Sequence, residues 1–264
     1  MINISQLNKG LKTKSFGKKV YAFDSIDSTN TCARTMANAW APEGTLVIAE
    51  FQTAGRGRLG RPWNANAEEN LTFSLVLRPG KSSESLNLLP LLAGIAVARA
   101  IQEVTGQEPE CKWPNDILIG GKKVCGILLE GALRDDGLDF VVAGIGINVN
   151  QTDFPPELSE GATSLRRLCG HEFNREELLR AVLQHFERLY RAEREENFSS
   201  IPRLWLAHTR MIGKPLEIHS NETTLAGTAV RIAADGGLVI ATESGEQTVY
   251  AGDVTVRPPD QATS

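Results

Sequence analysis

Residues 45–77, TLVIAEFQTAGRGRLGRPWNANAEENLTFSLVL, contain the pattern from which the fold of this chain can be worked out. The stretch begins with the apolar run Thr45–Phe51 and ends with the run Asn70–Leu77, and both have the composition and alternation of strands. The connection between them is long for a compact domain, and such loops usually carry function. We therefore expect this loop to be held at both ends by a folded domain.

The connection contains Gly55-Arg56-Gly57-Arg58-Leu59-Gly60-Arg61-Pro62, closed by Trp63. Glycines let the backbone adopt positive φ and approach a ligand closely, and successive N–H groups can surround an anion. Arginines add planar charged groups that match carboxylate or phosphate. Arg/Gly-rich runs also occur in disordered tails that bind nucleic acid. The flanking strands favour a loop that closes over an anionic small molecule.

The overall composition indicates a folded protein without a bulk charge that would attract nucleic acid. The chain has 264 residues, 41% of them hydrophobic, and a formal net charge of −4. Its longest apolar run, Leu88–Ala98, is too short to span a bilayer, and the N-terminus has no signal-peptide core. The cysteines form no CxxC pair and do not cluster with histidines, which argues against zinc or disulfides. We expect a cytoplasmic protein that binds neither DNA nor membrane.

The remaining strand and helix signals predict two domains after a short lead-in. Residues 1–20 are rich in lysine and predict a solvated lead-in, followed by domains at 21–210 and 211–264. Helices are predicted where Ala33, Met36, Ala37 and Trp40 recur at helical spacing, at Leu86–Val104, after the capping pair Asn174 and Glu177, and at Ser200–His208. Strands are predicted at Val20–Ile26, Pro109–Trp113, Asp116–Ile119, Lys123–Leu133 and Leu138–Ile147. Beyond residue 211, a small barrel of about five strands is predicted from Pro215–His219, Leu225–Ile232, Gly237–Thr242, Gln247–Tyr250 and Val254–Arg257.

Lys112-Trp113-Pro114-Asn115-Asp116 forms a second polar cluster, between two predicted strands. A lysine and an aspartate at this point could bind a triphosphate and its magnesium, because Mg²⁺ prefers one or two carboxylates with phosphate oxygens. The other interpretation is a tight turn that carries surface charges. Local sequence alone leans towards the turn.

Three further motifs each allow two interpretations. Lys123 opens an apolar strand and is either a solvated strand end or a cation aimed at developing charge, while Gly126 within that strand suggests a close approach of a ligand or backbone. Gly144–Asn150 is either the base of a flat ligand site, with Asn148 reading a base edge, or a Gly-rich strand under a helix. Ser28-Thr29-Asn30 is either a helix cap or a donor group for a polar ligand. Glu50 and Glu130 receive no role.

Taken together, these clusters resemble the biotin protein ligases, also called biotin–[acetyl-CoA-carboxylase] ligases. The resemblance runs from about Tyr21 to Pro258, and its most specific parts are the Gly-Arg-Gly-Arg-x-Gly-Arg and Lys-Trp-Pro-Asn-Asp runs. The matching pieces follow the family's order and roughly its spacing: Asp27–Asn30, Gln52–Arg61 with Trp63, Lys112–Asp116, Lys123–Glu130 and Gly144–Asn150.

The resemblance implies an α+β fold: a mixed β-sheet with packed helices, the class II synthetase-like fold of biotin and lipoate ligases, followed by a C-terminal SH3-like β-barrel. It also implies two reaction steps. Biotin and ATP form biotinyl-5′-AMP, and a lysine of a biotin carboxyl carrier protein then takes the biotinyl group. Mg²⁺ accompanies ATP. A homodimer is compatible with the fold. The few residues before the first strand imply the ligase-only form, without an N-terminal DNA-binding domain.

The resemblance also assigns roles to individual residues. It makes Arg58 and Lys123 catalytic, nearest the biotin carboxylate and the α-phosphate. The biotin-binding positions are Ser28, Thr29, Asn30, Gln52, Gly55, Arg56, Arg58, Lys123, Gly126 and Gly144. The ATP-binding positions are Arg58, Trp63, Lys112, Asn115, Asp116, Lys123, Asn148 and Arg257, with Asp116 also a magnesium ligand.

Three other functions remain to be separated from this one. Lipoate ligases share the fold, but the arginine run favours biotin. A DNA-binding repressor is disfavoured by the short N-terminus. A non-catalytic biotin-binding protein would have little reason to retain Lys112, Asp116 and Lys123 together with the arginines. If the loop closes over the adenylate, replacing Arg58 with glycine releases that intermediate.

Overall fold

The computed structural model describes residues 1–80, 85–135, 137–219 and 224–256. Its helices are α1 (Ile4–Asn8), α2 (Thr29–Asn38), the 3₁₀ turn η1 (Arg58–Gly60), α3 (Ser85–Thr105), α4 (Pro156–Ser159), α5 (Leu165–Cys169), α6 (Arg175–Arg194) and α7 (Ile201–Leu206). Its strands are β1 (Val20–Ile26), β2 (Leu46–Gln52), β3 (Leu71–Leu77), β4 (Glu110–Lys112), β5 (Asp116–Ile119), β6 (Lys122–Arg134), β7 (Gly137–Ile147), β8 (Pro215–His219), β9 (Thr224–Ile232), β10 (Leu238–Thr242), β11 (Gly245–Val249) and β12 (Asp253–Val256).

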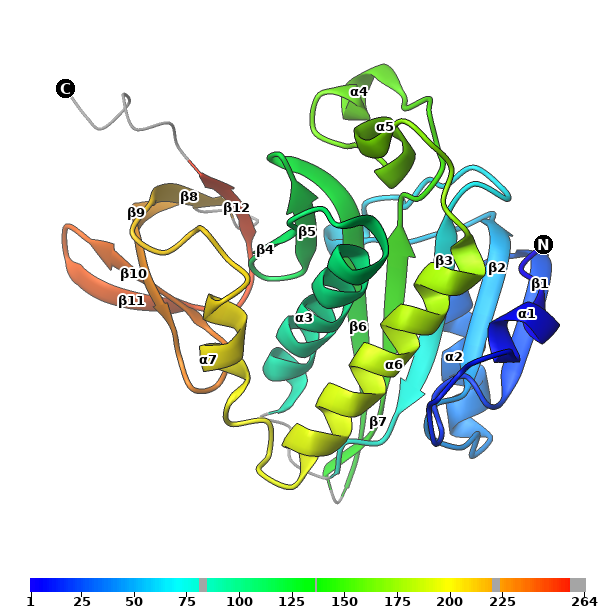
Figure 1. Cartoon of the computed structure of the whole chain (residues 1–264). Coiled ribbons are helices and arrows are strands. Elements are labelled where there is room, and N and C mark those ends of the chain that lie inside the picture. Colours follow the sequence, from blue (N-terminus) through cyan, green and yellow to red (C-terminus); the bar gives the residue numbers. More distant parts are fainter. Residues whose placement is uncertain (81–84, 136, 220–223, 257–264) are drawn as a thin grey trace.

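A seven-stranded mixed sheet forms the centre of the main domain. Its strand order is β1-β2-β3-β7-β6-β5-β4, with β1 parallel to β2 and the other described neighbours antiparallel. Helices α3 and α6 pack together on one face, and α2 packs on the other against β2, β3 and β7 (Figure 1). The mixed sheet with packed helices confirms the predicted fold class.

The C-terminal strands form a separate antiparallel sheet of five strands in the order β11-β10-β9-β8-β12. It lies beside β4 and β5 at one end of the main sheet (Figure 1). The prediction of five strands is confirmed, with bounds that agree within two residues at most ends. Among the described residues no ladder pairs β11 with β12, so the sheet is not closed into a complete barrel there.

Local sequence patterns predicted the positions of most helices and strands. The predicted bounds of β1, β5 and β8 match the structure, and α6 begins after Asn174, whose side chain accepts from the N–H of Glu177 as expected for a cap. Trp40 differs from the prediction. It lies beyond the end of α2, has a φ of 60° and is 69% exposed, and its ring is flanked by the guanidinium groups of Arg78 and Arg134.

Helix α3 is long and apolar enough to cross a membrane by length and composition, but 67% of its apolar window is buried within the protein. It packs against α6, α7 and the face of the main sheet. A central helix surrounded by other elements is apolar on most sides. Its composition is therefore accounted for by the core.

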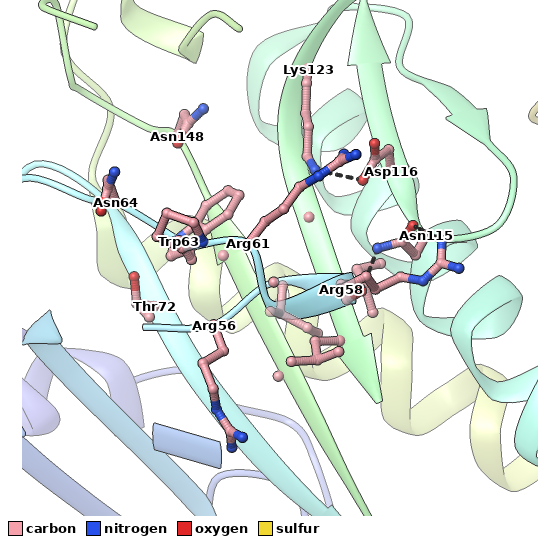
Figure 2. A pocket seen from close by; sticks show the side chains of 18 of the residues that line it. Arg56, Arg58, Arg61, Trp63, Asn64, Thr72, Asn115, Asp116, Lys123 and Asn148 are labelled. Carbon is pink, nitrogen blue, oxygen red and sulfur yellow. Dashed lines mark hydrogen bonds and ion pairs between the residues drawn. The ribbon is translucent and has the colours of Figure 1, made fainter. Parts of the chain in front are cut away.

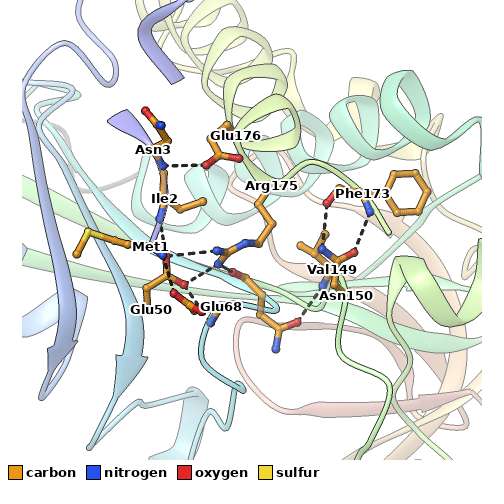
Figure 3. A network of polar contacts seen from close by, with 11 residues as sticks. Met1, Ile2, Asn3, Glu50, Glu68, Val149, Asn150, Phe173, Arg175 and Glu176 are labelled. Carbon is orange, nitrogen blue, oxygen red and sulfur yellow. Dashed lines mark hydrogen bonds and ion pairs between the residues drawn. The ribbon is translucent and has the colours of Figure 1, made fainter. Parts of the chain in front are cut away.

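The prediction of a solvated lead-in is wrong for several of its apolar residues. Ile2, Leu7, Leu11 and Phe16 are buried, and α1 packs on α6. Polar contacts hold the same segment, as Figure 3 shows: the N–H of Ile2 donates to Glu50 Oε1 at 2.6 Å. Glu50 in turn pairs with Arg175 Nη1 at 2.7 Å, so a buried carboxylate without a predicted role joins the lead-in, β2 and α6. The lysines of the lead-in concealed this amphipathic pattern.

Glu187 of α6 makes the second attachment of the lead-in. Its carboxylate accepts from the N–H groups of Lys14, Ser15 and Phe16. Burial raises the pKa of this carboxyl, but the backbone donors outweigh burial and the net pKa is lowered. The ionised carboxylate thus acts as a cap for three backbone groups.

Candidate active site

A cavity of about 340 Å³ lies where the loop after β2 meets the strands β6 and β7 and the start of α2. Thirteen of the residues selected from the sequence line this cavity, and Figure 2 shows several of them. These are Ser28, Thr29, Asn30, Gln52, Arg56, Arg58, Trp63, Asn115, Asp116, Lys123, Gly126, Gly144 and Asn148. Residues from motifs far apart in the sequence therefore line one cavity, while the ligand contacts of each remain predictions.

The N-terminus of α2 supplies one wall of the cavity. Ser28 is the N-cap and its hydroxyl faces the N–H of Thr31, so the capping interpretation is correct. Thr29 and Asn30 are buried and also line the cavity, while a contact of this motif with a polar ligand remains a prediction. The Oε1 of Gln52 accepts from the N–H of Thr29 at 2.7 Å, which fixes the orientation of the Gln52 amide.

We call Thr29, Asn30 and Gln52, which line the cavity, together with Ser74, which lies behind them without lining it, the floor of the cavity. Ser74 lies on β3, is fully buried, and contacts Thr29 Oγ1 at 2.8 Å and Asn30 Oδ1 at 2.6 Å. It was not among the residues selected from the sequence. Nothing local marks it, since it is one small residue within an apolar strand.

Three glycines give room to side chains of the site. A Cβ on Gly144 would lie 2.2 Å from Asn30 Oδ1, and one on Gly146 would lie 2.3 Å from the Trp63 ring. A Cβ on Gly126 would lie 3.0 Å from the same ring. The Gly-rich strand β7 therefore serves both as a seat for the α2 terminus and as a base beneath Trp63.

The arginine loop, residues 55–63, forms a compact hairpin-like lobe above this floor. Arg56 and Pro62 form an antiparallel bridge, and the N–H of Trp63 donates to Gly55 O at 3.0 Å. A Cβ on Gly55 would lie 2.6 Å from Trp63 O, so only glycine fits at the base of the lobe. Gly55 does not line the cavity, and it acts here on loop shape.

The three arginines of the loop point to different partners. Arg56 forms an ion pair with Glu130 at 3.5 Å, and Arg61 pairs with Asp253 of β12. Arg58 donates to Asn115 Oδ1 at 3.2 Å and to the carbonyl of Gly252 at 3.4 Å. Burial lowers the pKa of Arg58, and the charges of Asp253 and Asp116 act in the opposite direction. The C-terminal sheet thus takes part in the site through Gly252 and Asp253.

Lys123 of β6 lies between Asp116 and the ring of Trp63 in the cavity. Its Nζ forms an ion pair with Asp116 Oδ1 at 2.7 Å and lies 5.8 Å from the centroid of the Trp63 ring (Figure 2). The Nε1 of Trp63 is buried without a hydrogen-bond partner in the described part of the chain. An indole N–H in this state is free to donate to a ligand acceptor.

The Lys112–Asp116 run forms the predicted turn, and binding of a triphosphate by its side chains remains a prediction. It forms the turn between β4 and β5, with Lys112 paired to Asp116 in register, and Trp113 Nε1 donates to Gly236 O of the C-terminal sheet at 3.1 Å. Asn115 and Asp116 reach the main cavity. Lys112 instead lines an adjoining cavity of about 330 Å³, together with Arg58, Arg61 and Asp253.

Two remaining predictions have different outcomes. Asn148 is buried at the edge of the cavity, where its Nδ2 donates to Thr163 O at 3.1 Å. Arg257 lies outside the described residues. The segment from Phe154 to Ala162 also lines the cavity, held beside β6 by the N–H of Lys123 and Gly161 O at 2.8 Å, and no sequence motif indicated it.

Two family models match the chain. Residues 22–148 match the biotin/lipoate A/B protein ligase family, and residues 211–257 match the biotin protein ligase C-terminal domain. The bifunctional ligase/repressor BirA of Bacillus subtilis (strain 168) is 40% identical over 252 residues, covering 95% of this chain and 78% of its own length. The biotin–[acetyl-CoA-carboxylase] ligase of Paracoccus denitrificans is 32% identical and covers 86% of this chain and 96% of its own.

Solved structures agree with the sequence comparisons. The biotin protein ligase of Aquifex aeolicus, in complex with biotin and ATP, superposes with a TM-score of 0.78 at 32% identity, over 91% of this chain and 99% of that one. The fold, the two matched segments and the gathering of the motifs around one cavity lead to the same result. The chain belongs to the biotin protein ligases.

Proposed function

We propose that the cavity binds biotin and ATP side by side, forms biotinyl-5′-AMP, and delivers the biotinyl group to a lysine of a biotin carboxyl carrier protein. The observation that carries this proposal is the meeting of Lys123, Arg58 and Trp63 over a neutral, buried floor. Such a site offers cations at one end and hydrogen-bonding groups in an apolar setting at the other.

The first step joins two anions, since a carboxylate oxygen of biotin attacks the α-phosphate and pyrophosphate leaves. Lys123 and Arg58 are the cations placed to offset this repulsion and the charge that develops on the phosphate. In the structure Lys123 forms an ion pair with Asp116 at 2.7 Å. A bound phosphate would replace Asp116 as the anion that faces Lys123.

The floor suits the neutral ring system of biotin. Gln52 and Thr29 are polar groups that hydrogen-bond to each other, and Ile127 and Leu128 line the same cavity with apolar side chains. Trp63, seated on Gly126 and Gly146, has a flat face for an adenine ring. Asn148 lies nearby, in agreement with its predicted role at the base edge.

Mg²⁺ fits the site as a companion of the triphosphate and not as a resident ion. No cluster of three or more His, Cys, Asp or Glu side chains occurs in the described ranges. Asp116 is the carboxylate beside the predicted phosphate position, and its buried Oδ1 makes an ion pair but no hydrogen bond. When bound, Mg²⁺ neutralises phosphate charge, and Asp116 is the residue that would hold it.

In the second step the ε-amine of the acceptor lysine attacks the carbonyl carbon of the mixed anhydride and AMP leaves. The protein contributes by excluding water until the acceptor arrives, because water hydrolyses the same anhydride. The arginine loop covers the cavity and is the element suited to that task. We place the reaction in the cytoplasm, where ATP and free cysteines such as the four in this chain are usual.

Pyrophosphate–ATP exchange with biotin, with lipoate and with neither compound tests the first step. We expect exchange only with biotin and magnesium. Exchange with lipoate alone would transfer the assignment to the lipoate ligases, and tight biotin binding without exchange would leave a binding protein. Labelled biotin with a carrier domain and its Lys→Arg variant then tests the transfer, which is expected only with the lysine form.

A further inference from the structure

The floor continues into a chain of buried and partly buried hydrogen bonds that ends outside the cavity at Glu130 of β6. Asn30 Nδ2 donates to Glu130 Oε2 at 2.7 Å, and Glu130 Oε1 faces Arg56 at 3.5 Å. With Ser74 and Thr29, the chain runs from Gln52 at one end to the arginine loop at the other. Neither Ser74 nor Glu130 had a role from the sequence.

Glu130 sets the direction of the whole chain. A carboxylate accepts hydrogen bonds, so the NH₂ group of Asn30 must face Glu130 and its Oδ1 must face Ser74. Since Oδ1 carries no hydrogen, the Ser74 hydroxyl donates to it. The second N–H of Asn30 points at Leu128 O at 3.4 Å, so every polar atom of this amide contacts protein.

Ser74 then fixes what Thr29 offers to a ligand. The Ser74 hydroxyl is shared between Asn30 Oδ1 at 2.6 Å and Thr29 Oγ1 at 2.8 Å, and the Thr29 hydroxyl donates in turn to Gln52 Oε1 at 2.9 Å. The single proton of Thr29 therefore always has a protein acceptor. Thr29 faces the cavity only as an acceptor, and Gln52, whose Oε1 is occupied, presents its Nε2 as a donor.

Space for this arrangement is also built into the sheet. Ser74 and Gly144 are partners in the β3–β7 register, and a Cβ on Gly144 would overlap Asn30 Oδ1 at 2.2 Å. The two neighbouring small residues leave a slot that the Asn30 amide fills. An amide that is 5% exposed and held in such a slot cannot rotate freely.

We propose that Ser74, Asn30 and Glu130 form a positioning relay that sets the hydrogen-bond polarity of Thr29 and Gln52 for biotin. Asn30 acts through its neighbours and not by contact with the ligand. The proposal rests on the proposed function, because it takes the floor to be the biotin-binding part of the cavity. It assigns no role to the relay in binding ATP.

The test compares Ser74→Ala with Thr45→Ala as a matched control. Thr45 is also fully buried and its hydroxyl makes one hydrogen bond, to Pro42 O at 2.7 Å, but Pro42, unlike the partners of Ser74, does not line the cavity. Ser74→Ala is expected to raise the KM for biotin and the calorimetric Kd for biotin about 10-fold, with the KM for ATP changed less than about 2-fold. Thr45→Ala should leave all three values unchanged, although both variants lose a buried hydrogen bond.

Glu130 variants examine the other end. Glu130→Gln retains an oxygen acceptor for Asn30 and should stay within about 3-fold of the wild type, whereas Glu130→Ala should match Ser74→Ala. The double variant Ser74→Ala/Glu130→Ala should equal either single variant, because both act through Asn30. Ser74→Cys, with a weaker donor of similar size, should give a smaller increase and serves if Ser74→Ala does not fold.

Several outcomes would overturn the relay: an unchanged KM for biotin in folded Ser74→Ala, an equal increase in Thr45→Ala, or multiplied effects in the double variant. In each case, wild-type exchange that depends on biotin would leave the proposed function intact. Wild-type protein without such exchange would instead count against the function.

Discussion

The arginine loop and the floor face each other across one cavity, yet they are held by different kinds of interaction. In the loop, the side chains of Arg56 and Arg61 are 50% and 68% exposed and their partners are single carboxylates. In the floor, Thr29 and Ser74 are 3% and 0% exposed and lie in a continuous chain of hydrogen bonds. Exposed ion pairs contribute little to stability, while buried polar groups are costly to leave unpaired.

This difference assigns separate tasks to the two regions. A fixed floor can discriminate one polar ligand from another, because a wrong ligand leaves buried groups unpaired. A loop held by weak contacts can open for substrates and close over an intermediate. Changes in the floor should therefore alter affinity for biotin. Changes in the loop should alter retention of the adenylate and binding of the nucleotide.

Lys123 lies between the two regions, and its replacement should have the largest effect. Lys123→Ala removes the cation that faces Asp116 and lies near Trp63. We expect kcat/KM for biotin-dependent pyrophosphate exchange to fall about 10³-fold, as for the loss of a group that stabilises developing charge. Lys122→Ala, at the exposed neighbouring position, is the control and should remain close to the wild type. An equal decrease of kcat/KM in both variants would show that Lys123 has no specific role in the reaction.

Arg58→Gly should separate synthesis from retention of the adenylate. The change removes the contacts of the loop with Asn115 and with the C-terminal sheet at Gly252. We expect free biotinyl-5′-AMP to leave about 10- to 100-fold faster, measured by trapping with a simple amine. Arg231→Gly, which breaks an exposed pair with Glu246 away from the loop, provides the comparison. Trapping no greater than in wild type would count against the loop as a barrier.

A methyl group beneath Trp63 tests whether the strand or the loop positions that ring. In Gly146→Ala the new Cβ would stand 2.3 Å from the indole, so the ring must move. We expect the KM for ATP to rise about 10-fold, with a smaller change in the KM for biotin. Gly161→Ala also lines the cavity but meets open space, and should have no effect. An equal KM for ATP in the two variants would mean that contacts within the loop alone position the Trp63 ring.

The sequence was sufficient for parts of the site that depend on local motifs. The Gly-Arg run, the Lys112–Asp116 turn and Gly144 are each recognisable within a few residues, and the topology brings them together. Ser74 and Glu130 were missed because their significance lies in contacts with residues 44 and 100 positions away in the chain. Such pairing depends on strand order, which no single motif encodes.

The prediction of a solvated lead-in was wrong for the same reason, because burial of its apolar residues depends on contacts with distant parts of the chain. Leu7 and Phe16 are sparse apolar residues among lysines, and they are buried only because α6 offers a complementary surface. Periodicity within a short segment carries too little signal to show this. Trp40 is the reverse case, since its spacing suggested the helix face but the chain turns away at a positive φ.

Asp253→Asn should give the smallest effect and the finest test of how weakly the loop is held. Asp253 pairs with Arg61 from the C-terminal sheet and lines both cavities, so it is an internal anion near the predicted phosphate position. Because the Arg61 side chain of this pair is 68% exposed, loss of the pair should speed tryptic cleavage of the loop only about 2- to 3-fold. The freed Arg61 should lower the KM for ATP by up to about 2-fold. Glu246→Gln, which removes an exposed pair on the same sheet, should change neither value. A slower cleavage, or a KM for ATP that rises, would mean that Asp253 assists the nucleotide and does not compete with it.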